Sequence, residues 1–145
     1  MVNLFQGKTF WYRIQNDSLK VVESDVDYNL ALAEPAGDTS MTLPDYAKFI
    51  QYNLKGLQVQ DNVLKSKTYE YLHYGLNDYS IGWRNVNRSD KQLSEHSGSA
   101  GTFFCYTFLD KKRNLAYIII ANSATKQAQQ GIFKLLDRLK QKYGS

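Results

Sequence analysis

The chain has few of the residues that build disulfide frameworks or metal sites. It contains one cysteine, Cys105, and two histidines among its 145 residues. A single thiol excludes an internal disulfide and any site made of several cysteines. The two histidines, His73 and His96, lack the His-Glu-x-x-His spacing of a zinc site. We therefore expect no metal and no cofactor.

Long apolar runs are also absent. The longest, Leu115 to Ala121, is far shorter than the ~20 residues that cross a bilayer, so we expect no membrane span. The first residues show no basic stretch followed by an apolar one, and no signal peptide is visible. With 43% hydrophobic and 22% charged residues, the composition is that of a folded chain, and its length suits one domain.

The positive charge is confined to one end. Residues 126–145 carry five basic side chains and one acidic one, which accounts for the whole net charge of +4 and leaves residues 1–125 neutral. Basic residues late in a helix also complement its dipole. We interpret the charge as a solvated helix face, and we expect no nucleic-acid partner.

Residue periodicity predicts an α+β chain built on an antiparallel sheet. Residues 115–121 are apolar on both faces, as expected of a central strand covered by helices on two sides. The other expected elements are a hairpin over 9–23, an acidic loop over 23–38, helices from Thr42 and over Ser66–His73, strands over 79–86, 92–96 and 102–109, and a helix over 125–143.

Helix starts and faces follow from cap and stripe patterns. Thr42 with Asp45 resembles a capping box, and Ser66 and Ser123 are expected to cap the two later helices. His73 is expected to end its helix without a polar partner. The inner stripe of the last helix is predicted to be Ile132, Leu135, Leu136 and Leu139.

Several motifs occur in an order that goes beyond a generic α+β pattern. They are Pro35-Ala36-Gly37-Asp38-Thr39-Ser40 before Asp45-Tyr46-Ala47-Lys48-Phe49, then Tyr79-Ser80-Ile81-Gly82-Trp83, then His96-Ser97-Gly98-Ser99-Ala100-Gly101-Thr102-Phe103, and finally Ile118-Ile119-Ile120-Ala121-Asn122-Ser123. Together they resemble the C-terminal part of the serine β-lactamase and DD-peptidase superfamily, in its class C β-lactamase-like and esterase-like branch. The resemblance covers roughly residues 30 to 140.

The resemblance implies a partial β-lactamase/transpeptidase-like fold, with an antiparallel sheet and a C-terminal helix packed on it. We expect one domain over 1–145. Within it, 1–34 form a hairpin and loop, 35–75 a helical segment, and 79–145 the sheet with its closing helix. An intact parent of this family would be expected in the periplasm or outside the cytoplasm; the chain itself does not indicate a compartment.

The resemblance also implies acyl transfer to a lactam, peptide or ester through an acyl-enzyme. Carried over by position, His96 takes the place of the cationic or hydrogen-bonding residue, and Ser97 that of the substrate-contacting hydroxyl. Gly98 keeps the strand open to substrate. The Ser99 backbone N–H would be one donor of the oxyanion hole.

The family's nucleophile is missing from its expected place. Residues upstream of Pro35 are too few for the nucleophile helix, and the chain contains no Tyr-x-Asn. Ser123-Ala124-Thr125-Lys126 does spell Ser-x-x-Lys, but it follows the last strand. We therefore predict an inactive C-terminal portion whose partner is the missing N-terminal part or a second copy, with a small acyl substrate in the intact parent.

Two other hypotheses remain open. The chain could be a non-catalytic binding or oligomerisation module, because an apolar edge at residues 115–121 would invite association. It could also be a stand-alone enzyme that uses Ser123, Lys126 and His96 in another arrangement.

Overall fold

The computed structural model describes residues 11–15, 18–22, 39, 41–86, 89–99 and 102–144. The acidic loop expected over 23–38, which contains Pro35-Ala36-Gly37, lies outside the described residues. Residues 100 and 101 of the Gly-Ser-Ala-Gly segment also lie outside them.

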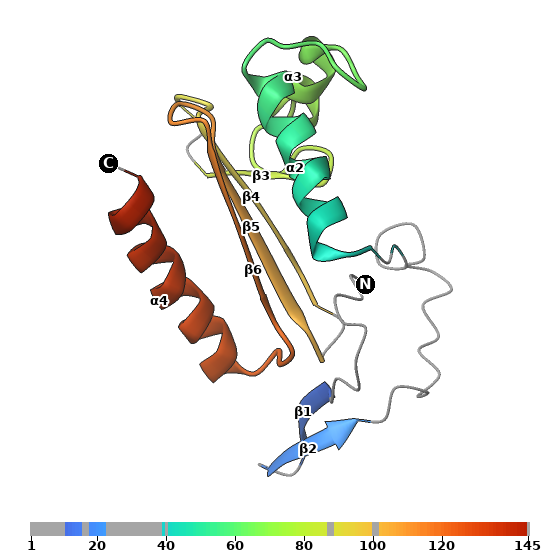
Figure 1. The fold of residues 1–145 in the computed structure, drawn as a ribbon, viewed down its shortest axis with the longest axis vertical. Coiled ribbons are helices and arrows are strands. Elements are labelled where there is room, and N and C mark those ends of the chain that lie inside the picture. Colours follow the sequence, from blue (N-terminus) through green and yellow to red (C-terminus); the bar gives the residue numbers. More distant parts are fainter. Residues whose placement is uncertain are drawn as a thin grey trace.

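The α+β class and the antiparallel sheet predicted from the sequence are confirmed. One sheet has two strands, β1 and β2, which pair only with each other; the other has four strands in the order β3-β4-β5-β6, all antiparallel (Figure 1). The elements are β1 (Trp11–Gln15), β2 (Ser18–Val22), α2 (Leu43–Leu57), α3 (Ser66–Tyr74), β3 (Arg84–Asn85), β4 (Leu93–Gly98), β5 (Phe104–Asp110), β6 (Leu115–Ala121) and α4 (Lys126–Tyr143).

Helices cover both faces of the four-stranded sheet, with α2 and α3 on one side and α4 on the other (Figure 1). Side chains alternate between the two faces along each strand. Leu109 and Ile118 pack with Ile50 and Leu57 of α2, whereas residues of β5 and β6 on the other face pack against α4. These residues are Phe104, Tyr106, Phe108, Tyr117 and Ile119, which meet Ile132 and Leu136.

The start of α2 follows the predicted capping pattern. The Thr42 hydroxyl accepts from the Asp45 backbone N–H at 3.3 Å and donates to the Asp45 carboxylate at 2.7 Å. Those contacts, with Lys48 beside the carboxylate, lower the pKa of Asp45. The cap satisfies one of the unpaired donors of the first turn and fixes where the helix begins.

Several local predictions were wrong. Residues 115–121, expected as a central strand, form β6 at the end of the four-stranded sheet among the described residues. Only Arg84–Asn85 of the strand expected over 79–86 is a strand, because a turn that includes Gly82 at φ +81° and the bond from the Ser80 N–H to the Trp83 carbonyl folds the preceding residues back. Lys65 rather than Ser66 precedes α3 as its N-cap residue, and Asp61 accepts from the Ser66 N–H instead.

Two further errors concern α4. Thr125, not Ser123, caps this helix by accepting from the Ala128 N–H at 3.2 Å. Leu135, predicted to lie on the inner stripe, is 45% exposed, whereas Ile132 and Leu136 are buried. The helix is rotated so that Leu135 lies on its flank.

Candidate functional site

Strand β4 carries the predicted site residues and extends beyond its neighbour β3. The two strands pair only at Arg84↔Glu95 and Asn85↔Ser94. His96, Ser97 and Gly98 therefore have β5 on one side and, among the described residues, no strand on the other. The side chain of His96 is half-buried, and the two residues after it are exposed.

Backbone directions along β4 follow from one hydrogen bond. The Val86 N–H donates to the Leu93 carbonyl at 3.0 Å, so the main-chain groups of Leu93 face β3. Successive residues of a strand direct these groups to opposite sides, and His96 therefore pairs with Thr107 of β5. The N–H and C=O of Ser97 point the other way, into the side that β3 leaves uncovered. A backbone of this kind can pair with an extended ligand.

His96 is held by its own surroundings. Its Nδ1 lies 2.7 Å from the Gly82 carbonyl, which can only accept, so Nδ1 carries the hydrogen. The Tyr79 hydroxyl lies 3.4 Å from the same nitrogen, and the Trp83 ring contacts the imidazole edge to face at 6.1 Å. In the neutral ring Nε2 is then left as an acceptor.

Gly98 lies beside that second nitrogen. A Cβ at Gly98 would stand 3.9 Å from the His96 Nε2 and within 4 Å of no other described atom outside its own chain neighbours. Because residues 96 and 98 share one face of β4, the glycine leaves the imidazole nitrogen accessible along the strand. Ser97 lies on the opposite face, so its hydroxyl and the His96 ring do not face the same side.

The fourth predicted residue, Ser99, follows β4 and is exposed. By continuation of the strand alternation its N–H would lie on the same side as that of Ser97. The family resemblance predicts a hydrogen-bond donor of the oxyanion hole on this side of the strand.

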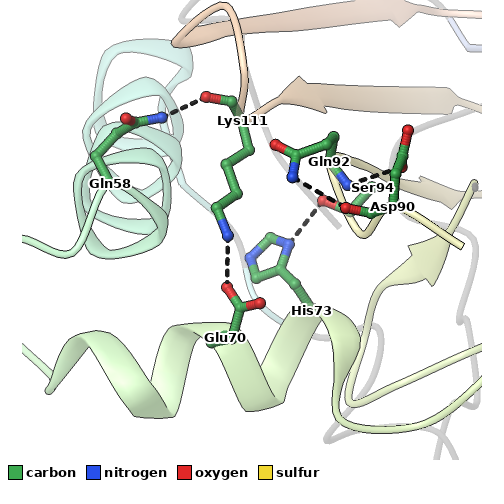
Figure 2. Close-up of polar contacts among 7 residues, drawn as sticks. All are labelled: Gln58, Glu70, His73, Asp90, Gln92, Ser94 and Lys111. Atoms are coloured by element: carbon green, nitrogen blue, oxygen red, sulfur yellow. Dashed lines mark hydrogen bonds and ion pairs between the residues drawn. The ribbon is translucent and has the colours of Figure 1, made fainter. Parts of the chain in front are cut away.

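A second polar cluster was missed by the sequence interpretation. His73, expected to have no partner, is fully buried between Ser94 and Asn53. Its Nδ1 lies 2.7 Å from the Ser94 hydroxyl and its Nε2 3.0 Å from the Asn53 Oδ1 (Figure 2 shows the Ser94 contact). The Asn53 amide nitrogen donates to the Phe49 carbonyl, which orients Oδ1 toward the ring.

These contacts assign the protonation of His73. Because Oδ1 only accepts, Nε2 carries the hydrogen, and Nδ1 accepts from the Ser94 hydroxyl. Burial lowers the pKa of His73 to about 3, and the charge of Lys111 acts in the same direction. The ring is therefore neutral at physiological pH and stacks on Trp83 with 4.2 Å between ring centroids.

The Ser94–His73–Asn53 chain has the composition of a hydrolase triad but not its accessibility. Ser94 and His73 have no solvent exposure and Asn53 has almost none. A nucleophile must approach a substrate carbonyl, and a hydroxyl sealed between a sheet and two helices cannot. The cluster instead joins α2, α3 and β4. The sequence offered one signal of this cluster. Asn53 is a polar residue on the buried face of α2, among Ile50, Leu54 and Leu57.

A separate group of polar contacts lies at the turn between β5 and β6. Lys111 in that turn forms an ion pair with Glu70 of α3 at 3.0 Å, and the Gln58 side-chain amide at the end of α2 donates to the Lys111 carbonyl (Figure 2). The Lys111 N–H donates to the Gln92 carbonyl at 2.8 Å. The end of the sheet away from His96 is thus tied to both helices.

Ser123 and Lys126 do not form a site with His96 in this structure. Strands β4 and β6 are separated by β5, and strand spacings of about 4.8 Å place their side chains roughly 10 Å apart, beyond direct proton transfer. The Ser123 hydroxyl lies 3.3 Å from that of Thr125, at the start of α4.

Cys105 is a half-buried thiol opposite Gly98 in the β4–β5 register. Burial raises its pKa, so the reactive thiolate is disfavoured. Cys105 packs against the core formed by α2, α3 and the sheet, which makes it a packing residue.

The described residues contain no group of three or more His, Cys, Asp or Glu side chains that could hold a metal ion. Within the same part of the chain, no helix is long and apolar enough to cross a membrane.

Comparison with known proteins gives no relative from which function could be transferred: no protein-family model and no curated protein sequence matches this chain.

Proposed function

We propose that this chain is the C-terminal portion of a β-lactamase-like serine hydrolase and provides one wall of an acyl-transfer site. The observation that carries the proposal is the uncovered stretch of β4, where the Ser97 main chain faces outward beside a half-buried His96. The motif order supports it, as does a sheet with helices on both faces and a closing helix after its last strand.

In this proposal β4 binds the acyl substrate through its backbone. The N–H and C=O of Ser97 pair with an extended peptide, ester or lactam side chain, as edge strands do. The Ser99 N–H contributes one donor of the oxyanion hole. Gly98 lets the substrate approach the strand.

His96 acts in this site as a hydrogen-bond acceptor. Its Nδ1–H is committed to the Gly82 carbonyl, which leaves Nε2 to accept a hydrogen bond or a proton from the substrate side. Gly82 can present its carbonyl there because its positive φ, +81°, is accessible to glycine.

The chain by itself is proposed to lack the nucleophile. It contains no Tyr-x-Asn, and its one Ser-x-x-Lys caps and begins α4 rather than lying beside β4. Acylation therefore requires a serine and lysine from another part of the domain or another chain.

A non-catalytic binding or oligomerisation module is the alternative. It is favoured by the unpaired outer side of β6 among the described residues. This alternative needs no chemistry at His96.

Covalent labelling tests whether the nucleophile is absent. The chain is incubated with a fluorescent penicillin and with an activated ester, and its intact mass is measured beside Ser123→Ala. We expect no stoichiometric adduct in either protein. An adduct that forms in the original chain and disappears in Ser123→Ala would overturn the proposal and support the stand-alone enzyme.

A further inference from the structure

A tight hairpin at the start of β3 places its tip next to the candidate site. Tyr79 bridges to Arg84 in antiparallel fashion, and a backbone hydrogen bond one step inside that bridge leaves Ile81 and Gly82 as the two-residue tip. The Gly82 carbonyl is the group that accepts from the His96 Nδ1 at 2.7 Å. The tip is therefore in direct contact with the imidazole.

The hairpin is fixed to helix α3 independently of any ligand. The Ser80 hydroxyl donates to the Tyr71 carbonyl at 2.7 Å, and the Ile81 N–H donates to the Leu72 carbonyl at 3.1 Å. Trp83 is buried in the core beneath it. A surface that is already ordered loses less entropy when it binds a partner.

Two apolar side chains of this hairpin remain exposed beside His96. Tyr79 is 54% exposed and Ile81 53% exposed. The Tyr79 hydroxyl lies 3.4 Å from the His96 Nδ1, and Ile81 directly precedes Gly82, which contacts the same nitrogen. Both side chains thus border the imidazole, and about half of each is available to a ligand.

Two glycines leave room around the same ring. Apart from the neighbouring residues of its own chain, no described atom lies within 4 Å of where a Cβ of Gly82 would stand. At Gly98 the only such atom is the His96 Nε2, at 3.9 Å. Glycines in such positions permit the close approach of a ligand.

The surroundings of His96 favour a ligand without charge. Neither residues 79–83 nor residues 96–99 include a lysine, arginine, aspartate or glutamate. Arg84, the next residue of the hairpin, is paired with Glu95. In the neutral ring, His96 presents Nε2 as an acceptor, which attracts an N–H or O–H group and repels a carboxylate.

We infer that the proposed acyl-transfer site selects an uncharged substrate whose apolar side chain packs against Tyr79 and Ile81. The inference rests on the proposed function, because it assumes that the substrate backbone pairs with Ser97. Side chains of an extended ligand alternate between the two faces of the sheet. The ligand residue next to the one opposite Ser97 therefore directs its side chain to the face that His96 and Gly98 share.

An aromatic or long aliphatic side chain at that ligand position would cover the exposed parts of Tyr79 and Ile81. Removing this apolar area from water is the source of the selectivity. A charged side chain there would lose hydration and gain no partner of opposite charge.

Affinities of three matched peptides for the 145-residue chain test the inference. The probes are N-acetyl tripeptide amides of sequence Gly-Phe-Gly, Gly-Ala-Gly and Gly-Asp-Gly, and their dissociation constants are taken from the NMR shift of the Ser97 amide. We expect the phenylalanine peptide to bind about fivefold or more tightly than the alanine peptide. The aspartate peptide should bind no more tightly than the alanine peptide.

Substitutions in the hairpin should act on the side-chain preference alone. Tyr79→Ala and Ile81→Ala should each weaken the phenylalanine peptide severalfold and leave the alanine peptide unchanged, whereas Tyr79→Phe, which keeps the ring, should retain the preference. The matched control is Tyr52→Ala, at a tyrosine of α2 that is 43% exposed and lies beside Asn62. It should leave all three affinities unchanged.

A charge placed at the tip separates selectivity from folding defects. Ile81→Lys should weaken the phenylalanine peptide and strengthen the aspartate peptide, because it supplies a cation for the carboxylate. A gain in affinity cannot arise from a loss of folded protein. Failure of the aspartate peptide to gain affinity in this variant would contradict the inference.

The remaining outcomes distinguish this inference from the proposed function. Saturable shifts at Ser97 with equal constants for the three peptides would overturn the inference and leave the proposed function standing. Variants at Tyr79 and Ile81 that weaken the alanine and phenylalanine peptides by the same factor would also overturn it. Absence of a Ser97 shift with every peptide would overturn the proposed function and this inference together.

Discussion

The Nδ1 of His73 accepts a hydrogen bond from the Ser94 hydroxyl at 2.7 Å, and this bond joins helix α3 to strand β4 inside the protein. With Asn53 on the other ring nitrogen, it links three elements through one neutral side chain. The strand that carries His96 is thereby fixed to the helical layer two residues away from the candidate site. The buried cluster stabilises the fold. It influences the candidate site by holding β4 in position.

Replacement of His73 by phenylalanine should destabilise the fold. His73→Phe keeps a ring that can stack on Trp83 but leaves Ser94 and Asn53 without their buried partner, at a cost of about 2–4 kcal/mol in the free energy of unfolding. Urea denaturation measures this. His96→Phe is the matched control, and because His96 is only half-buried we expect less than about 1 kcal/mol there. Equal losses in the two variants would contradict the assigned role.

The same side chain predicts a pH dependence of stability. Burial lowers the pKa of His73 to about 3, whereas in the unfolded chain it returns to its usual value of 6.5. Between these values the unfolded state binds a proton that the folded state does not, so stability falls as pH falls. We expect a loss of about 2 kcal/mol between pH 7 and pH 5 from this residue.

Urea denaturation of the original chain and of His73→Phe at both pH values isolates this contribution. The charged group that acts on the ring is Lys111, whose charge also disfavours protonation and which forms an ion pair with Glu70. Both remain in the variant. Identical pH dependence in the two proteins would exclude His73 as the source.

The start of α4 gives a direct contrast between two neighbouring hydroxyls. Thr125→Ala removes the acceptor of the Ala128 N–H and should cost about 1 kcal/mol of stability, as is typical for an N-cap. Ser123→Ala removes only longer contacts to Thr125, at 3.3 and 3.4 Å, and should cost a few tenths of that. Thermal unfolding compares the two. A larger loss of stability in Ser123→Ala than in Thr125→Ala would mean that Ser123 is the capping residue.

Sequence patterns predicted those elements whose signals are local. The run Leu115–Ala121 has the bounds of β6, and Thr42 with Asp45 marks the start of α2. The strand expected over 79–86 failed because Gly82 adopts a positive φ and folds a β-rich stretch into a turn. Periodicity does not report such a turn.

The partner of His73 could not be predicted because it depends on tertiary contact. Asn53, His73 and Ser94 are about 20 residues apart in sequence, and only the packing of α2 and α3 on β4 brings them together. For the candidate site, the sequence indicated His96 through Ser99. Among the described residues no strand pairs with the open side of Ser97, because β3 begins only at Arg84, whereas the sequence predicted a strand from residue 79.

The most direct test of the proposed site is the backbone amide of Ser97 in an NMR titration with an N-acetylated tripeptide. The amides of His96 and Gly98 are internal controls, because they face β5 while Ser97 faces the open side. The proposal predicts a saturable shift that is largest at Ser97 and smaller at its two neighbours. It also predicts that Gly98→Val, which places methyl groups beside the His96 Nε2, abolishes the shift. Shifts of equal size at all three amides, or none at Ser97 while other regions respond, would contradict the proposal that β4 is a substrate-binding wall.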